Sequence, residues 1–370
     1  RPLNNPDGSD MYRLTAQTNR SSVRPHDSDG DGLLDEDPGE DLEGDGYIRQ
    51  MRVLVGPGKG THLVDTAADP RGRLMRSVGA GQGLYLLMSE GVDNDLDGRI
   101  NEDGVGGLDL HRNYPTNWRP EPGRDVTGRG FTQLGAGAFP LSEPETRAVV
   151  EWVLTHPNIA VVNSMDTSVP MHLRGPSTCE QTECMFPADL KHYLHFDSVG
   201  LSITKYPWAG DVYRTYATRG GGGEPNPLFG HGPDFGYFHL GAIWYGDEIW
   251  NGGRERDYDN DGRIEPTEVL RYCDEEFAGR CYQNWTKAVH PVYGEVEVGG
   301  YNPKFFAQNG PPEVLERWAG RQAMFNLYMA QSLPRVEIAG ATVSPVRASA
   351  DSATHEIRVT VRNGGRLPVA

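Results

Sequence analysis

The clearest pattern in the chain is a helical segment followed by a short apolar segment. Residues 142–153 predict a helix that opens with a capping box, in which Ser142 is the N-cap and Glu145 follows three residues later. The segment at residues 159–165 is short and rich in apolar side chains, which predicts a buried parallel strand. A second buried strand is predicted at residues 241–245, running toward Glu248. This alternation of helix and strand is typical of an α/β sheet.

The pattern changes near the C-terminal end of the chain. Residues 312–332 have helical spacing, and we expect an apolar face made by Val314, Leu315, Trp318, Met324, Phe325 and Tyr328. Residues 355–362 alternate between apolar and polar side chains, and a turn is predicted at residues 363–365. A β-sandwich module needs about 100 residues, so the stretch from Val336 onward predicts only its opening strands. We therefore expect one domain at residues 1–338 and the beginning of a β-sandwich module at 339–370.

Composition narrows the class of protein. The chain has 370 residues with 47 glycines and 27 prolines, and residues 1–120 are expected to be rich in loops. No apolar run approaches the ~20 residues of a membrane span. The formal net charge of −17 argues against binding to nucleic acid, because phosphates would be repelled. The polar N-terminal segment is no signal peptide, and we expect that the chain enters its first domain partway through.

Four cysteines indicate the redox environment. They are Cys179, Cys184, Cys273 and Cys281, and two local pairs, 179 with 184 and 273 with 281, are easy to form. Four cysteines allow three pairings, and the sequence cannot choose among them. A zinc knot is the rival interpretation, although no Cys-x-x-Cys spacing supports it. Disulfides are favoured, and they predict a secreted or extracellular protein.

Much of the acidic charge is concentrated in short Asp-Gly loops. Residues 257–268 fit the EF-hand calcium loop, with oxygen ligands at the diagnostic positions and Gly262 at the sharp turn. An acidic surface loop is the alternative. The expected calcium ligands are Asp257, Asp259, Asp261, Arg263, Glu265 and Glu268.

Three further segments repeat the calcium pattern less completely. The loop at residues 93–103 lacks the Glu at position 12, the loop at 27–37 has its last acid one place early, and the loop at 41–46 is the weakest. The expected ligands are Asp93, Asp95, Asp97, Arg99 and Asn101 in the first, Asp27, Asp29, Asp31 and Asp35 in the second, and Asp41, Glu43 and Asp45 in the third. We expect these ions to stiffen long loops.

The segment 107–118, Gly-Leu-Asp-Leu-His-Arg-Asn-Tyr-Pro-Thr-Asn-Trp, carries the most specific motif. It resembles the Gly-Val-Asp-Leu-Asn-Arg-Asn-Tyr/Phe signature of the zinc metallocarboxypeptidases of the carboxypeptidase A type, and the calcium loops suggest the large secreted bacterial members. The resemblance implies that Arg112 binds the C-terminal carboxylate of a peptide, a task for which a planar guanidinium is well suited. His111 stands where the family has an Asn that also contacts this carboxylate.

Two further residues match catalytic positions of this family. Residues 234–250 resemble the family segment that ends in Glu-Leu-Trp or Glu-Leu-Arg, which implies that Glu248 is the general base. The alternative is a solvated Glu at a strand end. Residues 5–8, Asn-Pro-Asp-Gly, match a family motif, and Arg52 then falls at the position of the Arg that polarises the scissile carbonyl. A surface Arg is equally consistent with that position.

The zinc ligands are where the resemblance breaks. The family takes two ligands from a His-x-x-Glu pair, which does not occur in the 370 residues, and a third from a His after the central strand. Alignment on Leu173 and Arg174 places Asp166 in the position of that His. His172 is a possible substitute, although a residue at this place in a strand more often packs or caps.

The resemblance implies a three-layer α/β sandwich around a mixed, mainly parallel sheet. Our hypothesis is a secreted, calcium-stabilised zinc metallocarboxypeptidase-like domain, a hydrolase by resemblance, with a degenerate zinc site and no expected activity in this chain. Peptide C-termini are the expected partners if the domain is active. The alternative is a non-catalytic extracellular scaffold or assembly subunit. We also expect a homo-oligomer or a complementing chain. The family fold takes several strands from an upstream segment, and without those strands the sheet would leave edges exposed.

Overall fold

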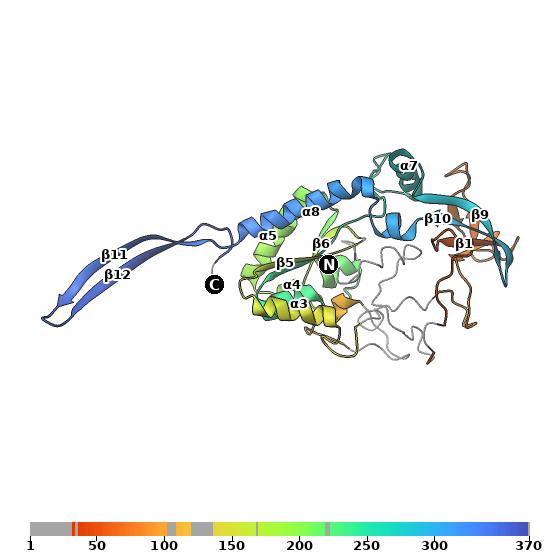
Figure 1. Ribbon diagram of the computed structural model, residues 1–370. Helices are drawn as coiled ribbons and strands as arrows, with labels where there is room; N and C mark the ends of the chain where they lie inside the picture. Colours follow the sequence, from red (N-terminus) through yellow and green to blue (C-terminus); the bar gives the residue numbers. More distant parts are fainter. Residues whose placement is uncertain are drawn as a thin grey trace.

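The computed structural model describes residues 32–33, 36–101, 109–119, 136–167, 169–218 and 223–368, and it has a mixed α/β fold (Figure 1). Its central sheet has four strands in the order β5-β8-β6-β7. These are β5 (Val161–Asp166), β8 (Ile243–Glu248), β6 (Met171–Arg174) and β7 (Trp208–Asp211). Strands β5 and β8 are parallel, whereas β6 runs antiparallel to β8. The strands predicted at residues 159–165 and 241–245 are therefore confirmed, although β5 is only partly buried, with Met165 55% exposed.

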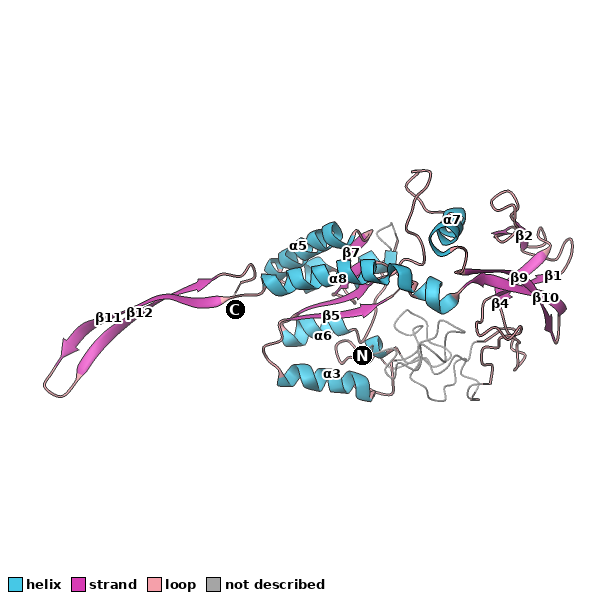
Figure 2. Ribbon diagram, turned by 45° about the horizontal axis from the view of Figure 1, so that its top comes forward, coloured by secondary structure: helices cyan, strands magenta, loops and turns pink. Residues whose placement is uncertain are grey.

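Helices cover both faces of this sheet. Neighbouring residues of β8 point to opposite faces, so each packs against a different set of helices. Tyr245 packs with α5 (Pro187–Thr204) and α8 (Pro312–Ser332), through Phe196 and Phe325 among others. Trp244 packs on the other side with α3 (Pro144–Thr155) and α6 (Gly232–Phe235). Figure 2 shows α5 and α8 on one side of β5, and α3 and α6 on the other.

The predicted helix at residues 142–153 is confirmed, but its capping box is wrong. Helix α3 begins at Pro144 and its N-cap is Glu143, with no capping bond from a side chain. Proline favours the first helical position, since it has no N–H to leave unpaired there. Ser142 therefore lies one place too early, and its hydroxyl donates a hydrogen bond to Glu143 Oε1 (2.8 Å).

A six-stranded antiparallel sheet occupies much of the segment that we expected to be rich in loops. Its strands, in the order β3-β2-β4-β1-β10-β9, come from both ends of the chain. They are β1 (Gln50–Leu54), β2 (His62–Val64), β3 (Met75–Ser77), β4 (Tyr85–Ser89), β9 (Tyr282–His290) and β10 (Gly294–Tyr301). Met51 and Val298, paired in register, are fully buried in its core. Strands β1 to β4, of three to five residues each, leave too short a pattern for sequence analysis to detect, whereas β9 and β10 are longer and were not predicted.

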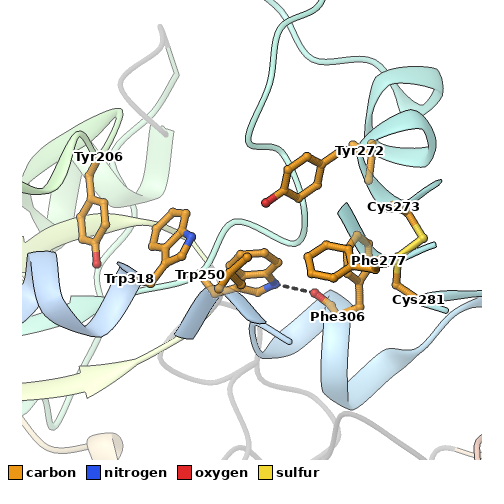
Figure 3. Packing of buried hydrophobic residues seen from close by; sticks show 10 residues of the cluster. Tyr206, Trp250, Tyr272, Cys273, Phe277, Cys281, Phe306 and Trp318 are labelled. Carbon is orange, nitrogen blue, oxygen red and sulfur yellow. Dashed lines mark hydrogen bonds between the residues drawn. A yellow bond between two sulfur atoms is a disulfide. The ribbon is translucent and has the colours of Figure 1, made fainter. Parts of the chain in front are cut away.

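An aromatic cluster joins the two sheets. Figure 3 shows Trp250, at the end of β8, between Trp318 of α8 and Phe306. The Trp250 indole donates a hydrogen bond to the carbonyl oxygen of Phe306 (2.5 Å). Phe306 belongs to the short helix η4 (Pro303–Gln308), and Phe277 packs against it from α7 (Pro266–Phe277).

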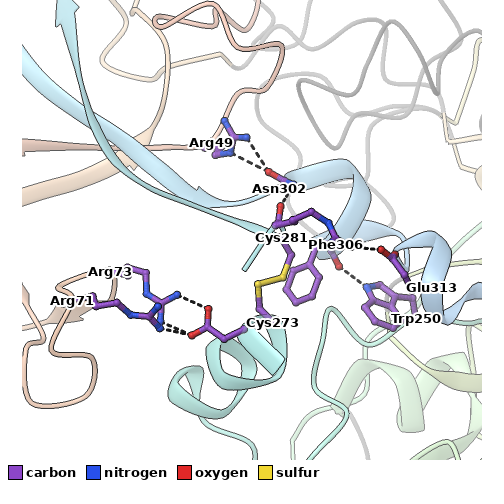
Figure 4. Close-up of a disulfide and its surroundings, with 11 residues drawn as sticks. Arg49, Arg71, Arg73, Trp250, Cys273, Cys281, Asn302, Phe306 and Glu313 are labelled. Atoms are coloured by element: carbon purple, nitrogen blue, oxygen red, sulfur yellow. Dashed lines mark hydrogen bonds and ion pairs between the residues drawn. A yellow bond between two sulfur atoms is a disulfide. The ribbon is translucent and has the colours of Figure 1, made fainter. Parts of the chain in front are cut away.

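The predicted disulfides are confirmed, and of the three possible pairings the structure has the two local ones. Cys179 bonds to Cys184 across α4 (Gln181–Cys184), and Cys273 bonds to Cys281. Figure 4 shows that the second disulfide ties α7 to the start of β9. Arg73 reaches the same place from the six-stranded sheet, because its guanidinium donates to both carboxylate oxygens of Asp274 (2.9 Å each).

Helix α8 has the bounds that the sequence predicts, but its buried face differs. Val314, Trp318 and Phe325 are buried as expected, whereas Leu315 and Met324 are 45% and 57% exposed. Beyond α8, strands β11 (Val336–Ala348) and β12 (Ala353–Asn363) form a separate antiparallel ribbon, which Figure 1 shows extending away from the rest of the chain. No helix among the described residues is both long enough and apolar enough to cross a membrane.

Candidate functional site

A cavity of about 200 Å³ lies at the carboxyl ends of β5 and β8. Ligands bind at such strand ends in many α/β proteins, because the loops that follow parallel strands meet there. Four of the predicted site residues line this cavity, namely His111, Arg112, Asp166 and Glu248. The rest of its wall is formed by Thr167, Val169, Leu173, Tyr216, Leu228, His231 and Gly246.

The Arg and His of the cavity come from one short turn, η1 (Leu110–Arg112). Asp109 caps this turn, since its carboxylate accepts a hydrogen bond from the backbone N–H of His111 (3.1 Å). The same carboxylate lies 3.5 Å from the Arg112 guanidinium. Asp109 is buried, at 1% exposure. Its carboxylate therefore fixes both the backbone of the turn and the position of the Arg112 guanidinium.

Two neighbours hold this turn against the fold. The fully buried Asn113 donates from its amide to the carbonyl oxygens of Ala136 (2.7 Å) and Phe139 (3.0 Å). Gly230 lies against the other side, where a Cβ would come within 2.0 Å of the Arg112 carbonyl oxygen. Its φ of +67° also favours glycine. The close approach brings the following residue, His231, next to Arg112.

The two carboxylates of the cavity end neighbouring strands, where Asp166 pairs in register with Glu248. Asp166 Oδ2 lies 3.8 Å from His111 Nδ1, and Asp166 Oδ1 accepts the backbone N–H of Thr167 (2.8 Å). Glu248 accepts the backbone N–H of Val169 (2.8 Å), which holds the loop after β5 against the end of β8. The two residues that depart from the family pattern, His111 and Asp166, therefore face each other.

His231 is a cavity residue that sequence analysis missed. Its Nδ1 lies 2.9 Å from the hydroxyl of Ser177, which is itself fully buried. Burial first, and then the nearby Arg112 and His111, hold the pKa of His231 well below its ordinary value, so the imidazole is neutral. The only signal in the sequence is a histidine between two glycines just before the Pro-Asp that opens α6.

A buried carboxyl group lies behind Ser177. Asp234 is fully buried and accepts the backbone N–H of Ser177 (2.9 Å). Burial raises the pKa of Asp234 to about 7, against the pull of its hydrogen bonds with Ser177. Asp234, Ser177 and His231 thus form a polar chain from the protein interior to the cavity wall.

Arg52 and His172 lie elsewhere. Arg52 is in β1 of the six-stranded sheet, where it pairs with Glu297 (2.8 Å) and packs over the ring of Trp285. It does not line the cavity. His172 is fully buried in β6, between Asp247 (3.0 Å) and the hydroxyl of Thr204 (2.9 Å). The packing role that we considered for His172 fits this position, and the role of a substitute ligand does not.

Among the described residues, the donors around Asp166 are fewer than a catalytic zinc ion takes. Such a site takes three protein ligands and leaves one position for water. Among the described residues, His111 is the one nitrogen donor paired with Asp166, and its 3.8 Å separation is that of a loose ion pair. Groups of three or more candidate ligands in this part of the chain gather only at the acidic loops.

Two of the acidic loops have the same backbone geometry. Position 1 accepts the N–H of position 6, from Gly262 to Asp257 (2.8 Å) and from Gly98 to Asp93 (3.1 Å). Positions 3 and 5 accept the N–H groups of positions 5 and 7 in both loops. The glycines at position 6 have φ values of +88° and +92°. Possible ligand groups are Asp257, Asp259 and Glu268, then Asp259, Asp261 and Glu265, and finally Asp93, Asp95 and Asp97.

The third described loop gathers a different set of ligands from the one predicted. Asp41 and Glu43 lie with Glu90, a fully buried residue from the end of β4, in a group that could hold a cation. Asp45 instead pairs with Arg49 (2.7 Å). In the loop at residues 93–103 the Asn101 amide donates a hydrogen bond to the carbonyl oxygen of Glu90 (2.5 Å). Glu90 is distant in sequence from Asp41, so no local pattern could indicate it.

Some predicted residues lie outside the described part of the chain. These are the four expected ligands of the loop at residues 27–37, Asp27, Asp29, Asp31 and Asp35, and the Asn-Pro-Asp-Gly motif at residues 5–8.

Comparison with known proteins supplies one informative match. The sequence model of a family described as Zinc carboxypeptidase matches residues 85–276, which is more than half of the chain. No curated protein matches. Among solved structures, the crystal structure of thrombin activatable fibrinolysis inhibitor is similar, at 17% sequence identity and a TM-score of 0.30. That similarity covers 51% of this chain and 42% of the other, so less than half of the other protein is spanned.

Proposed function

Because the chain belongs to the zinc carboxypeptidase family, we propose that its cavity binds the C-terminal carboxylate of a peptide. The observation that carries this proposal is the position of Arg112, which is buried in the cavity wall and held by Asp109. A guanidinium in a partly dry cavity makes strong, paired hydrogen bonds to a carboxylate. The imidazole of His111, the residue before Arg112, also lines the cavity.

We further propose that binding is not followed by zinc-dependent hydrolysis in this chain. The support is the donor set, since Asp166 and His111 face each other where a third ligand would be needed. Glu248, our candidate general base, holds the backbone of Val169 in this arrangement. Arg52, our candidate carbonyl-polarising residue, is engaged by Glu297, so the proposal gives it a structural role.

The test of carboxylate binding is the variant Arg112→Gln. A hydrogen bond to a charged group contributes about 1.5–3 kcal/mol, so we expect the variant to bind a peptide with a free C-terminus roughly 10- to 100-fold more weakly. Isothermal titration calorimetry with the free peptide and with its C-terminal amide measures this. Wild-type protein should bind the amide as weakly as the variant binds the free peptide.

Arg147→Gln is the matched control, because Arg147 is an exposed arginine on α3 away from the cavity. Its affinity should equal that of the wild type. Equal binding of the free peptide and its amide would contradict the proposal. Elemental analysis of the same protein tests the second proposal, which predicts calcium and no stoichiometric zinc; one zinc per chain together with peptidase activity would overturn it.

We also propose that the domain is secreted and stabilised by calcium. The two disulfides support an oxidising environment. The repeated loop geometry and the carboxylate groups at residues 93–97 and 257–268 support calcium, because hard oxygen donors at these positions are what the ion prefers. The described part of the third loop supports Asp41, Glu43 and Glu90 as its ligands.

Removing calcium should lower the thermal unfolding midpoint. A ligand at 100 times its dissociation constant stabilises the folded state by about 2.7 kcal/mol, so a chelator should cost the wild-type protein several degrees. The variant Asp259→Asn should lose part of this difference, because Asp259 belongs to both candidate ligand groups of its loop. Differential scanning calorimetry with calcium and with EGTA measures it.

Asp65→Asn is the control for that experiment. Asp65 also accepts a backbone N–H in a turn, from Ala68 (3.1 Å), but it lies outside the acidic loops. The control should keep the full response to calcium. An identical midpoint of the wild-type protein with calcium and with chelator would contradict the calcium proposal.

We keep the domain boundaries predicted from the sequence as a proposal. We propose a carboxypeptidase-like three-layer domain at residues 1–338 and a β-sandwich-type module beginning at 339. The amphipathic ribbon supports the second unit, since Ile338, Val343, Ile357, Val359 and Val361 pair on one face and are all exposed. A sheet with one apolar face is typical of a strand pair that packs against another sheet.

A further inference from the structure

The cavity has a polar atom opposite its apolar wall that the binding of a carboxylate does not use. Leu173 and Leu228 line the cavity and are 5% and 1% exposed. His231 lines it as well, and a Cβ placed on Gly246 would lie 3.6 Å from His231 Nε2. Because position 246 is glycine, the Nε2 edge of the ring is left open toward the cavity.

The ring of His231 is fixed in orientation. Its Nδ1 is engaged by the buried hydroxyl of Ser177, whose backbone N–H is in turn held by Asp234. The ring also makes an edge contact with His111, at 5.9 Å between centroids. A neutral imidazole has one donor and one acceptor nitrogen, so with Nδ1 occupied the Nε2 atom presents one hydrogen-bonding position to the cavity.

From this geometry we propose that His231 is a specificity-determining residue, which selects peptides whose C-terminal residue has an amide side chain, asparagine or glutamine. The inference rests on the proposed binding of the peptide carboxylate by Arg112, which places the last side chain in the same small cavity. An amide group carries a donor and an acceptor at one end, so it can pair with Nε2 in either tautomer of the imidazole.

An aliphatic side chain of the same size is rejected by the same atom. Leucine is close to asparagine in shape, but it would cover Nε2 without a hydrogen bond. A buried polar atom that loses water and gains no partner weakens binding. We therefore expect a peptide ending in asparagine to bind at least about tenfold more tightly than the matched peptide ending in leucine.

The experiment is isothermal titration calorimetry of the full chain with four tetrapeptides. They end in asparagine or leucine and carry either a free carboxylate or a C-terminal amide. The wild-type comparison requires no variant, so it cannot be confused with misfolding. In His231→Phe the ratio of the two affinities should fall toward one, in His231→Gln the asparagine preference should persist, and the exposed control His156→Phe should match the wild type.

The outcomes separate this inference from the proposal beneath it. Equal affinity for asparagine and leucine, with binding still dependent on the free carboxylate, would overturn the role of His231 and leave the role of Arg112 intact. A fifth peptide ends in aspartate. If it bound more tightly than the peptide ending in asparagine, the proposed preference for amide side chains would be wrong. No binding of any free peptide at millimolar concentration would overturn both proposals.

Discussion

Replacing Asp197 with asparagine is expected to lower the free energy of unfolding by about 3–5 kcal/mol. Asp197 forms an ion pair with Arg174, whose side chain is 1% exposed in the core (2.8 Å). Burial raises the pKa of Asp197, while Arg174 and a hydrogen bond from the Tyr245 hydroxyl (2.8 Å) favour its charged form. Loss of this carboxylate would leave a guanidinium charge in the interior with too few partners.

Urea unfolding followed by tryptophan fluorescence measures this effect. Glu180→Gln is the matched control, because Glu180 pairs with Arg214 at the surface, where such pairs contribute about 1 kcal/mol or less. The double variant Arg174→Met with Asp197→Leu should be more stable than Asp197→Asn, since it removes the charge along with its partner. An Asp197→Asn variant as stable as the surface control would show that Arg174 is not held by this pair.

The elements that could be predicted from sequence are those with a long or continuous apolar pattern. Residues 312–332 and 159–165 carry such patterns, and both form the predicted elements. Strands β1 to β4 of the six-stranded sheet were missed because they are only three to five residues long, and the contact between β1 and β10 joins distant segments, as in the pairing of Gln50 with Gly299. The pairing of distant strands depends on the tertiary fold, which local periodicity does not encode.

The candidate site shows the same division. Motif similarity indicated Arg112, His111, Asp166 and Glu248, and the structure brings these four into one cavity. It could not indicate His231, because the role of a histidine depends on what faces each ring nitrogen. Glu90 was missed for a related reason, since its neighbours Asp41 and Glu43 lie 49 and 47 residues away in sequence. Conversely, Arg52 falls near the family position of the carbonyl-polarising Arg, but its side chain pairs with Glu297 in the other sheet.

The pairing of His111 with Asp166 connects the two departures from the family pattern. Each substitution alone would damage a site, because one introduces an imidazole where an amide is usual and the other a carboxylate where an imidazole is usual. Placed 3.8 Å apart, they keep a polar wall beside Arg112. This arrangement supports the proposal that the cavity binds a carboxylate without a metal ion.

Replacing Asp234 with asparagine is expected to change the pH dependence of stability by roughly 4 kcal/mol. Burial raises the pKa of Asp234 from an ordinary 3.8 to about 7 in the folded protein. Between these two values the folded state keeps a proton that the unfolded state releases, so stability from this group is complete below about pH 4. It falls as pH rises through 7 and is fully lost above that. Roughly three pKa units correspond to about 4 kcal/mol.

The asparagine variant lacks this titration, so its stability relative to the wild type should rise steadily from pH 4 to pH 8. Chemical unfolding of both proteins at several pH values gives the difference curve directly. Asp351→Asn, at the exposed turn between β11 and β12, controls for the loss of a carboxylate, and its curve should lack this rise. A flat difference curve for Asp234→Asn would mean that Asp234 is already ionised in the folded protein. The buried chain from Asp234 through Ser177 to His231 would then carry a negative charge behind the cavity wall.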